Sequence, residues 1–142
     1  MRVAVAILVC LCTSLGHGAA TAATPKKDMD KLNQCIQSAS GNDLDAKDCY
    51  VALAQGEDAR LNVNWKRLIE AVGGKGSAKG KALLAEQKAW LGYRDAACFH
   101  MALDGGTLDR LQAQICYTNL ITARADEIAD FADFYHDPYS PN

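Results

Sequence analysis

The spacing of the cysteines constrains this chain more than any other feature. Six cysteines occur in 142 residues, and two of them fall in an apolar run at the N-terminus. The other four are Cys35, Cys49, Cys98 and Cys116. An even number of cysteines in a small exported domain predicts two disulfides. The spacing fits neither a CxxC motif nor a Cys/His zinc pattern, so no metal site is expected.

The first residues predict an export signal. Arg2 supplies a positive charge, residues 3–15 are apolar apart from one Thr and one Ser, and small residues follow as far as Ala22. We therefore expect a signal peptide at 1–22 and a single domain at 23–142, with its core at about 29–135. The apolar run is too short to span a bilayer as a stable helix. A short anchor that stays attached is the weaker alternative.

Cys10 and Cys12 raise the question of lipidation. Lipoprotein processing requires a small residue before the modified cysteine, but Val9 and Leu11 precede these two. The sequence therefore predicts a periplasmic or secreted protein that is not a lipoprotein and has no transmembrane segment after cleavage.

The charge balance does not favour a nucleic-acid partner. The whole chain carries 15 Lys and Arg against 17 Asp and Glu, and removal of Arg2 makes it slightly more acidic. Basic residues gather between Arg60 and Arg94, whereas acidic residues gather after Arg124. Runs of this kind are usually solvated helix faces.

The hydrophobic spacing predicts an all-α fold, a small antiparallel bundle of about four helices. No window alternates like a strand. The expected helices are 29–39, a second helix capped by Asn42 or Asp43 and reaching Val72, 77–103, and 107–135 with Thr107 as its cap. Gly56 weakens the second helix by about 1 kcal/mol relative to Ala, so the sequence would allow a kink there.

Two apolar stripes define the expected inner faces. The second helix carries Val51, Ala54, Asp58, Leu61, Trp65, Leu68 and Val72 at steps of three and four residues. The third helix carries Leu84, Gln87, Leu91, Arg94, Cys98 and Met101, widened by Leu83, Trp90 and Ala97.

Helix geometry favours one of the three possible disulfide pairings. Cys35 and Cys49 are equidistant from Asn42, and Cys98 and Cys116 are nearly equidistant from their turn, with an offset of only ~3 Å of helix rise. The prediction is that each hairpin closes its own disulfide. In the chain-entropy model each such loop stabilises the fold by ~3 kcal/mol.

A search for catalytic groups predicts that the protein is not an enzyme and has no cofactor. His100 and Asp104 lie four residues apart but lack a third metal ligand, so a surface ion pair is the better interpretation. The segment 73–77 is rich in glycine but lacks the spacing of a phosphate-binding loop. The four cysteines outside the signal peptide are assigned to disulfides, which leaves no free thiol as a nucleophile.

One cluster on the third helix has two interpretations. Gln87, Trp90, Arg94 and Cys98 share a face at the core or its rim. In the favoured structural interpretation, Trp90 fills the core while Gln87 and Arg94 bridge to the neighbouring helix. The functional interpretation is a binding surface, because Trp and Arg are enriched at interaction hot spots.

These residues carry a resemblance to a known family. The residues concerned are Cys35 and Cys49, Leu61-Asn62 with Trp65, the segment Gln87-x-x-Trp90-x-x-x-Arg94-Asp95-x-x-Cys98, Gly105-Gly106, Cys116 and Thr122-Ala123-Arg124. From Lys31 to about Ile128 the chain resembles the lysozyme inhibitor LprI-type domain of small exported bacterial proteins. Trp65 departs from the tyrosine that is more usual there.

The resemblance implies a helical disulfide domain outside the cytoplasm that inhibits lysozyme. None of the matching positions is identified by the resemblance as an inhibitory residue. Two hypotheses follow: an inhibitor of lysozyme or another wall-degrading hydrolase, and a periplasmic binding or envelope-assembly module with a different partner.

Three further expectations concern particular side chains. The register set by the second disulfide places Trp90 opposite Arg124 and Gln87 opposite Glu127, which predicts a cation–π contact of the guanidinium with the indole. The acidic residues Asp126, Asp130 and Asp133 would steer a basic lysozyme. Lys75, in the 73–77 loop, would approach the catalytic carboxylates of a glycosidase, although a solvated connector is the simpler interpretation of this loop.

Overall fold

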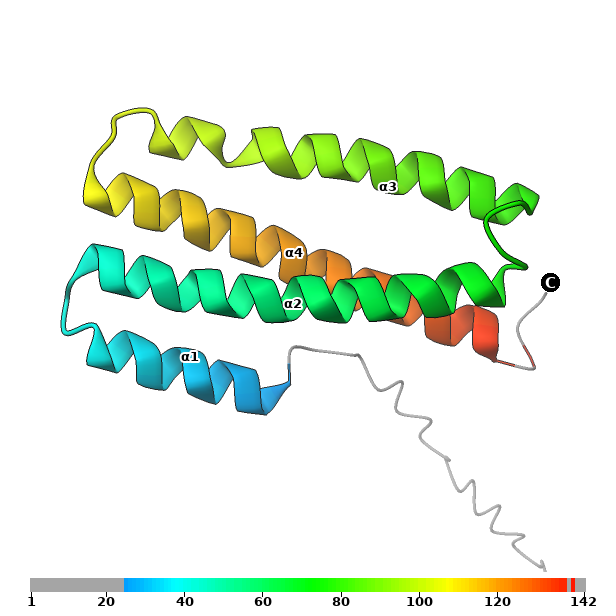
Figure 1. Cartoon of the computed structure of the whole chain (residues 1–142), viewed down its shortest axis with the longest axis horizontal. Coiled ribbons are helices and arrows are strands. Elements are labelled where there is room, and N and C mark those ends of the chain that lie inside the picture. Colours follow the sequence, from blue (N-terminus) through cyan, green and yellow to red (C-terminus); the bar gives the residue numbers. More distant parts are fainter. Residues whose placement is uncertain (1–24, 138, 140–142) are drawn as a thin grey trace, which may run out of the picture.

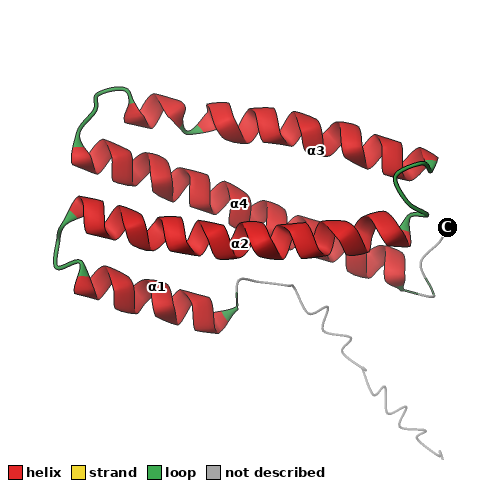
Figure 2. Ribbon diagram, in the orientation of Figure 1, coloured by secondary structure: helices red, strands yellow, loops and turns green. Residues whose placement is uncertain are grey.

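The computed structural model describes residues 25–137 and 139. Its elements are α1 (Lys26–Ser38), α2 (Asp43–Ala71), α3 (Ala78–Ala97), the short 3₁₀-helix η1 (Phe99–Ala102) and α4 (Thr107–His136). No strand occurs among these residues (Figure 2). The prediction of an all-α fold with four helices is therefore confirmed. The expected signal peptide at 1–22 lies outside the described residues.

Successive helices run antiparallel, which makes α2 and α4 parallel neighbours (Figure 1). The contacts between α2 and α4 have a nearly constant sequence separation, as two parallel helices require. The Thr118 hydroxyl contacts the carbonyl of Tyr50, 68 residues earlier. Two ion pairs, Arg60–Asp126 and Arg67–Asp133, each span 66 residues. The α2–α4 pair is thus held in one register along most of its length.

The core lies between α2 and α4. Its central cluster consists of Leu61, Leu68, Val72, Ala125, Ile128 and Ala132, with Trp65, Leu83, Trp90 and Tyr135 packed against it. The expected inner face of α2 is confirmed, because Ala54, Leu61, Leu68 and Val72 are all buried. α2 continues through Gly56 as one helix, since packing against α4 outweighs the low propensity of one glycine.

The hairpin between α1 and α2 follows the expected turn. The Asn42 side chain accepts hydrogen bonds from the backbone N–H groups of Leu44 and Asp45, at 2.9 and 3.3 Å, and so caps α2. Helix α1 begins three residues earlier than expected. Its start follows Pro25, whose carbonyl accepts from the Asp28 N–H at 2.8 Å.

The inner face of α3 is rotated relative to its expected stripe. Leu84 and Leu91 are 36% and 38% exposed, whereas Leu83 and Trp90 pack on the core. Adjacent leucines at 83 and 84 support two faces about 100° apart on a helical wheel, so the leucine spacing alone could not choose between them. The wider stripe of the prediction contained the correct face.

The junction between α3 and α4 differs from the prediction. α3 ends at Ala97 instead of continuing to Leu103, and η1 follows. The N-cap of α4 is Gly106, and Thr107 is the first helical residue. The Asp109 carboxylate accepts from the Gly106 N–H at 3.0 Å, while the Thr107 hydroxyl donates to Asp43 at 2.9 Å. Thr107 therefore joins the starts of α2 and α4 and does not act as a cap.

Both predicted disulfides are confirmed. Cys35–Cys49 links α1 to α2, and Cys98–Cys116 links the end of α3 to α4. Each bond closes a hairpin whose two helices approach at the same level. The pairing therefore follows from the turn positions alone.

Candidate functional site

Arg124 is the most heavily engaged charged side chain between α3 and α4. It is only 3% exposed. Its Nε and Nη2 donate to the Gln87 Oε1 at 3.0 and 2.8 Å. Its Nη1 donates to Glu86 at 2.8 Å and to Glu127 at 2.6 Å. Gln87 and Glu127, expected to face each other, therefore both accept hydrogen bonds from this guanidinium.

The Trp90 ring contacts two arginines. The Arg124 guanidinium carbon lies 5.7 Å from the centre of the Trp90 ring, and that of Arg94 lies 5.6 Å from it. The predicted contact of Arg124 with Trp90 is thus confirmed. Arg94 also lies 5.3 Å from the Tyr117 ring on α4 and pairs with Asp95 at 2.7 Å. Arginine and aromatic side chains therefore alternate along the α3–α4 contact.

These contacts support the structural interpretation of the Gln87–Cys98 segment. Gln87 and Trp90 are engaged with Arg124, and Arg94 contacts Tyr117, so three motif residues connect α3 to α4. A buried guanidinium with charge-assisted hydrogen bonds on all sides has a fixed orientation. The segment thus fixes α3 in place through Gln87, Trp90 and Arg94, while Tyr93 and Asp95 stay exposed.

Arg60 links α2 to α4 through a network that the sequence reasoning missed. Its Nε donates to Glu57 at 2.7 Å, and its Nη2 donates to Asp126 at 2.6 Å. Burial alone would lower the pKa of Arg60, but the hydrogen bonds and charges of Glu57 and Asp126 outweigh it and raise the pKa above the ordinary arginine value. The spacing of Glu57 and Arg60 predicts a local ion pair on one helix. The pair with Asp126 depends on the α2–α4 register and could not be read from the spacing.

The acidic residues expected to steer a partner are mostly neutralised. Asp126 pairs with Arg60, and Asp133 pairs with Arg67 at 2.7 Å. Asp130 is exposed and has no ion pair among the described residues. The structure does not bring the three carboxylates together as a free negative surface.

The 73–77 loop has a defined conformation. Gly73 and Gly74 both adopt a positive φ, of 87° and 86°, which favours glycine. The Gly74 N–H donates to the carbonyl of Ile69 at 2.8 Å, and the Gly74 carbonyl accepts from the Ser77 hydroxyl at 2.9 Å. The same hydroxyl oxygen caps α3 by accepting from the Gly80 N–H at 2.9 Å.

Close packing against α3 further restrains this loop. A Cβ added at Gly80 would lie 2.1 Å from the Gly74 carbonyl oxygen, so only glycine fits there. Lys75 is exposed, and its ammonium has no partner among the described residues. The loop is therefore more than a flexible connector, and it presents one free cation.

Asn62 makes only local contacts. Its side-chain amide donates to the Asp58 carbonyl at 2.8 Å and to the Asp58 carboxylate at 3.0 Å, one turn earlier on the surface of α2. Asn62 makes no hydrogen bond to the Gln87–Cys98 segment or to Arg124.

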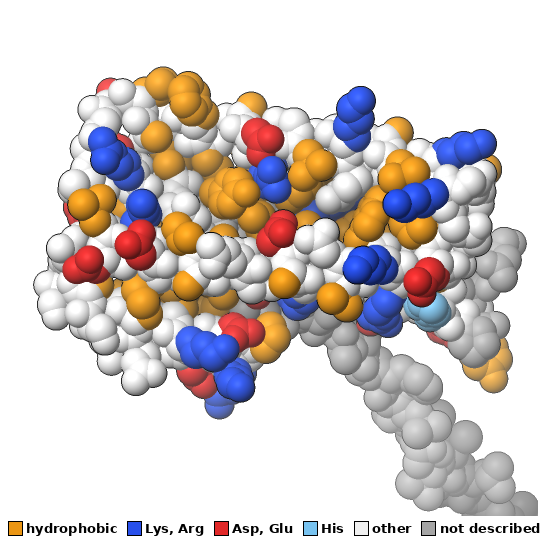
Figure 3. Space-filling view, viewed as in Figure 1, with side chains coloured by type: hydrophobic (Ala, Val, Ile, Leu, Met, Phe, Trp, Pro, Cys, Tyr) orange, Lys and Arg blue, Asp and Glu red, His pale blue; other side chains and the backbone are white. Residues whose placement is uncertain are grey.

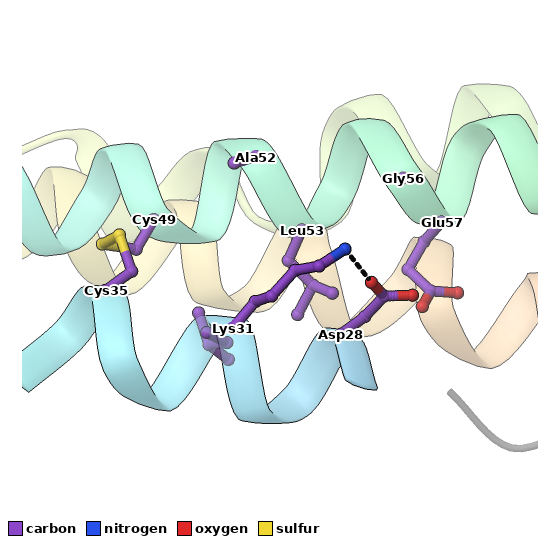
Figure 4. Close-up of a pocket in the computed structure, with 9 residues that line it drawn as sticks. Asp28, Lys31, Cys35, Cys49, Ala52, Leu53, Gly56 and Glu57 are labelled. Atoms are coloured by element: carbon purple, nitrogen blue, oxygen red, sulfur yellow. Dashed lines mark hydrogen bonds and ion pairs between the residues drawn. A yellow bond between two sulfur atoms is a disulfide. The ribbon is translucent and has the colours of Figure 1, made fainter. Parts of the chain in front are cut away.

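A cavity of about 340 Å³ lies between α1 and α2 (Figure 4). The Cys35–Cys49 disulfide borders it, and Lys31 pairs with Asp28 one turn earlier on α1, with the ammonium 2.7 Å from the carboxylate. The buried carboxylate of Glu57 also lines it but is engaged by Arg60. Both acidic groups of the cavity are thus paired with cations, which is not the arrangement of an acid and base awaiting a substrate.

The end of the molecule near η1 was not singled out by sequence reasoning. Phe99, Leu103 and Leu108 are all more than half exposed there. The sequence contained an indication of this surface, because these apolar residues fall outside the expected inner stripes. It was obscured by the expectation that α3 continues to Leu103.

Two searches of the described residues bear on the class of site. No group of three or more His, Cys, Asp or Glu side chains in this part of the chain could hold a metal ion. None of the helices from α1 to α4 is both long enough and apolar enough to cross a membrane.

Comparison with known proteins identifies the family. The sequence model of the family described as lysozyme inhibitor LprI matches residues 23–128, most of the chain. No curated protein and no solved structure was found to match. The match contains both disulfides, the Arg124 site and the 73–77 loop, but it ends before Asp130 and Asp133. From its sequence and its disulfide-bonded helices, the chain belongs to the lysozyme inhibitor LprI family.

Proposed function

We propose that this protein binds a lysozyme, or a related hydrolase that degrades bacterial cell walls, and inhibits it by blocking access to the substrate. The family match over residues 23–128 is the observation that carries this proposal. Two disulfides support action outside the reducing cytoplasm, in the periplasm or after secretion. We propose that the protein itself is not an enzyme.

The side chains of the described helices favour binding over catalysis. The buried carboxylate of Glu57 and the buried guanidinium of Arg124 are both held by opposite charges or hydrogen bonds. Such groups stabilise the scaffold, and they are not poised to transfer a proton. A preformed scaffold suits an inhibitor, because little conformational freedom is lost when it binds.

A turbidity assay tests the function directly. Lysis of a cell-wall suspension by lysozyme is followed with increasing amounts of the purified protein. We expect the lysis rate to fall and to level off near one protein per lysozyme. Reduced and alkylated protein is the control, because it lacks both disulfides but keeps the composition.

A second substrate separates the two hypotheses. A wall-binding or envelope-assembly module could slow lysis by coating the wall, but it would leave hydrolysis of a soluble chitooligosaccharide unchanged. An inhibitor slows both reactions. Failure to slow either reaction with any lysozyme tested would reject the proposed function.

A further inference from the structure

The link between α3 and α4 is longer than a helical hairpin needs. Residues 39–42 suffice to connect α1 to α2, whereas residues 98–106 connect α3 to α4 and include η1. The longer link places apolar side chains outside the core: Phe99 is 66% exposed and Leu103 is 64% exposed. Exposed apolar side chains contribute little to folding, and when they gather beside charged residues they mark binding surfaces.

This apolar surface is held in place. The Cys98–Cys116 disulfide anchors the start of the link to α4, and Cys98 itself is buried. A hollow of about 370 Å³ lies beside Phe99. Ala102, Ala113 and Tyr117 form part of its wall, and the charged residues Arg94, Asp95 and Arg110 also line it. Figure 3 shows apolar side chains gathered over this end of the molecule, at the upper left. We call Phe99, Met101, Leu103, Leu108 and this hollow the η1 patch.

The surroundings of the η1 patch are acidic. Residues 43–48 and 94–110 contain six carboxylates against three Lys and Arg. The Asp43–Thr107 hydrogen bond shows that the α2 segment adjoins the α4 end. Helix dipoles do not cancel this charge: α2 and α4 begin at this end while α1 and α3 finish there, so their partial charges offset one another (Figure 1).

The opposite end is not acidic overall. Residues 66–81 carry five Lys and Arg against Glu70 alone. Asp130, Asp133 and Asp137 near the end of α4 lie there too and offset most of this charge, Asp133 by pairing with Arg67 (Figure 1). A strongly basic partner would therefore be attracted more to the end that carries η1 than to the end that carries Lys75.

We infer that the η1 patch is the surface through which this protein docks onto a basic lysozyme. This inference rests on the proposed function and specifies where it resides. Phe99 and Leu103 make the apolar contact, and the surrounding carboxylates attract and orient the partner. The 73–77 loop then faces away from the complex.

The test measures affinity and inhibition for the full protein and matched variants against one strongly basic animal lysozyme. The double variant Phe99→Ser/Leu103→Ser should weaken binding at least about tenfold and reduce inhibition in parallel. Val63→Ser, which removes a 59% exposed apolar side chain from α2, is the control and should bind like wild type. Asp104→Asn should slow association and reduce its dependence on salt.

Melting curves show whether the double variant is folded. The single variant Leu103→Ser is measured as well, so that the test does not depend on the double variant alone. Inhibition by the double variant equal to wild type would overturn the η1 patch, and loss of inhibition in Lys75→Ala would then place the contact at the 73–77 loop. A dimer that dissociates in the double variant without any change in inhibition would assign the patch to self-association and also overturn the inference. No inhibition by wild type would instead reject the proposed function, and the inference with it.

Discussion

The α2–α4 pair and the α3–η1 segment are held together in different ways. α2 and α4 bury aliphatic side chains against each other, and Leu68, Ile128 and Ala132 are entirely inaccessible to solvent. α3 buries little of its own surface. It is attached through particular contacts: Lys79 over the Tyr135 ring, the hydrogen bonds of Arg124, the stacking of Arg94 on Tyr117, and the Cys98–Cys116 disulfide.

The two regions therefore have different roles: one stabilises the fold, and the other exposes apolar side chains to a binding partner. The α2–α4 core supplies most of the apolar burial, which is the main source of folding free energy. Leu83 and Trp90 of α3 pack on the core, but otherwise the α3–η1 segment depends on directional contacts that leave most of its apolar side chains exposed. Exposed leucines and aromatics on α3 and η1 are therefore available to a partner at little expense to the fold.

The largest expected effect comes from the core. Leu68→Ala removes a fully buried side chain from the α2–α4 interface and should lower the free energy of unfolding by about 2–5 kcal/mol. Leu91→Ala on α3, where the side chain is 38% exposed, should have an effect below about 1 kcal/mol. Urea unfolding of both variants measures the difference. Equal destabilisation would show that α3 belongs to the core as fully as α2 does.

The fold was largely predictable because its determinants are local. Turn residues around Asn42 and Gly105 fix the hairpins, and the hairpins fix the disulfide pairing. The inner face of α2 follows from its spacing because its apolar residues recur at steps of three and four. The face of α3 was ambiguous because Leu83 and Leu84 are adjacent, and the choice depends on the tertiary contact of Trp90 with Arg124.

A smaller effect is expected where α3 meets the 73–77 loop. Gly80→Ala places a Cβ against the Gly74 carbonyl oxygen, so the backbone must shift, and we expect a loss of about 1–3 kcal/mol. Gly92→Ala is the matched control on the same helix, because an added Cβ there meets nothing within 4 Å. It should stabilise the protein by about 0.5–1 kcal/mol, since alanine favours the helix. Thermal unfolding of the two variants should shift in opposite directions.

The candidate site was less predictable than the fold. Asp126 and Asp133 formed an acidic run in the sequence, but their arginine partners lie 66 residues earlier, and only the α2–α4 register brings them together. The η1 patch arises where a helix ends sooner than its pattern suggests. Ion pairs across helices and exposed link residues are tertiary features, and they leave little signal in local spacing.

The smallest effect concerns the attachment of α3 by Arg124. Arg124→Lys keeps the charge facing Glu86 and Glu127 but loses the forked donation to Gln87 and the planar contact with Trp90. A lysine ammonium cannot reproduce that geometry, so we expect a loss of about 1 kcal/mol in the free energy of unfolding.

The control for this variant is Arg67→Lys. Arg67 also pairs with a carboxylate, that of Asp133, but this ion pair is exposed. Exposed pairs contribute little, so this change should stay below about 0.5 kcal/mol. Arg124→Ala should be more damaging than Arg124→Lys, because it leaves Gln87 without its donor near the core. Hydrogen exchange should locate the added opening in α3 and leave the centre of α2 protected. Melting temperatures that match wild type in both Arg124 variants would show that α3 is held by its disulfide and apolar contacts alone. The arginine–aromatic contacts would then be a result of the helix packing and would not stabilise it.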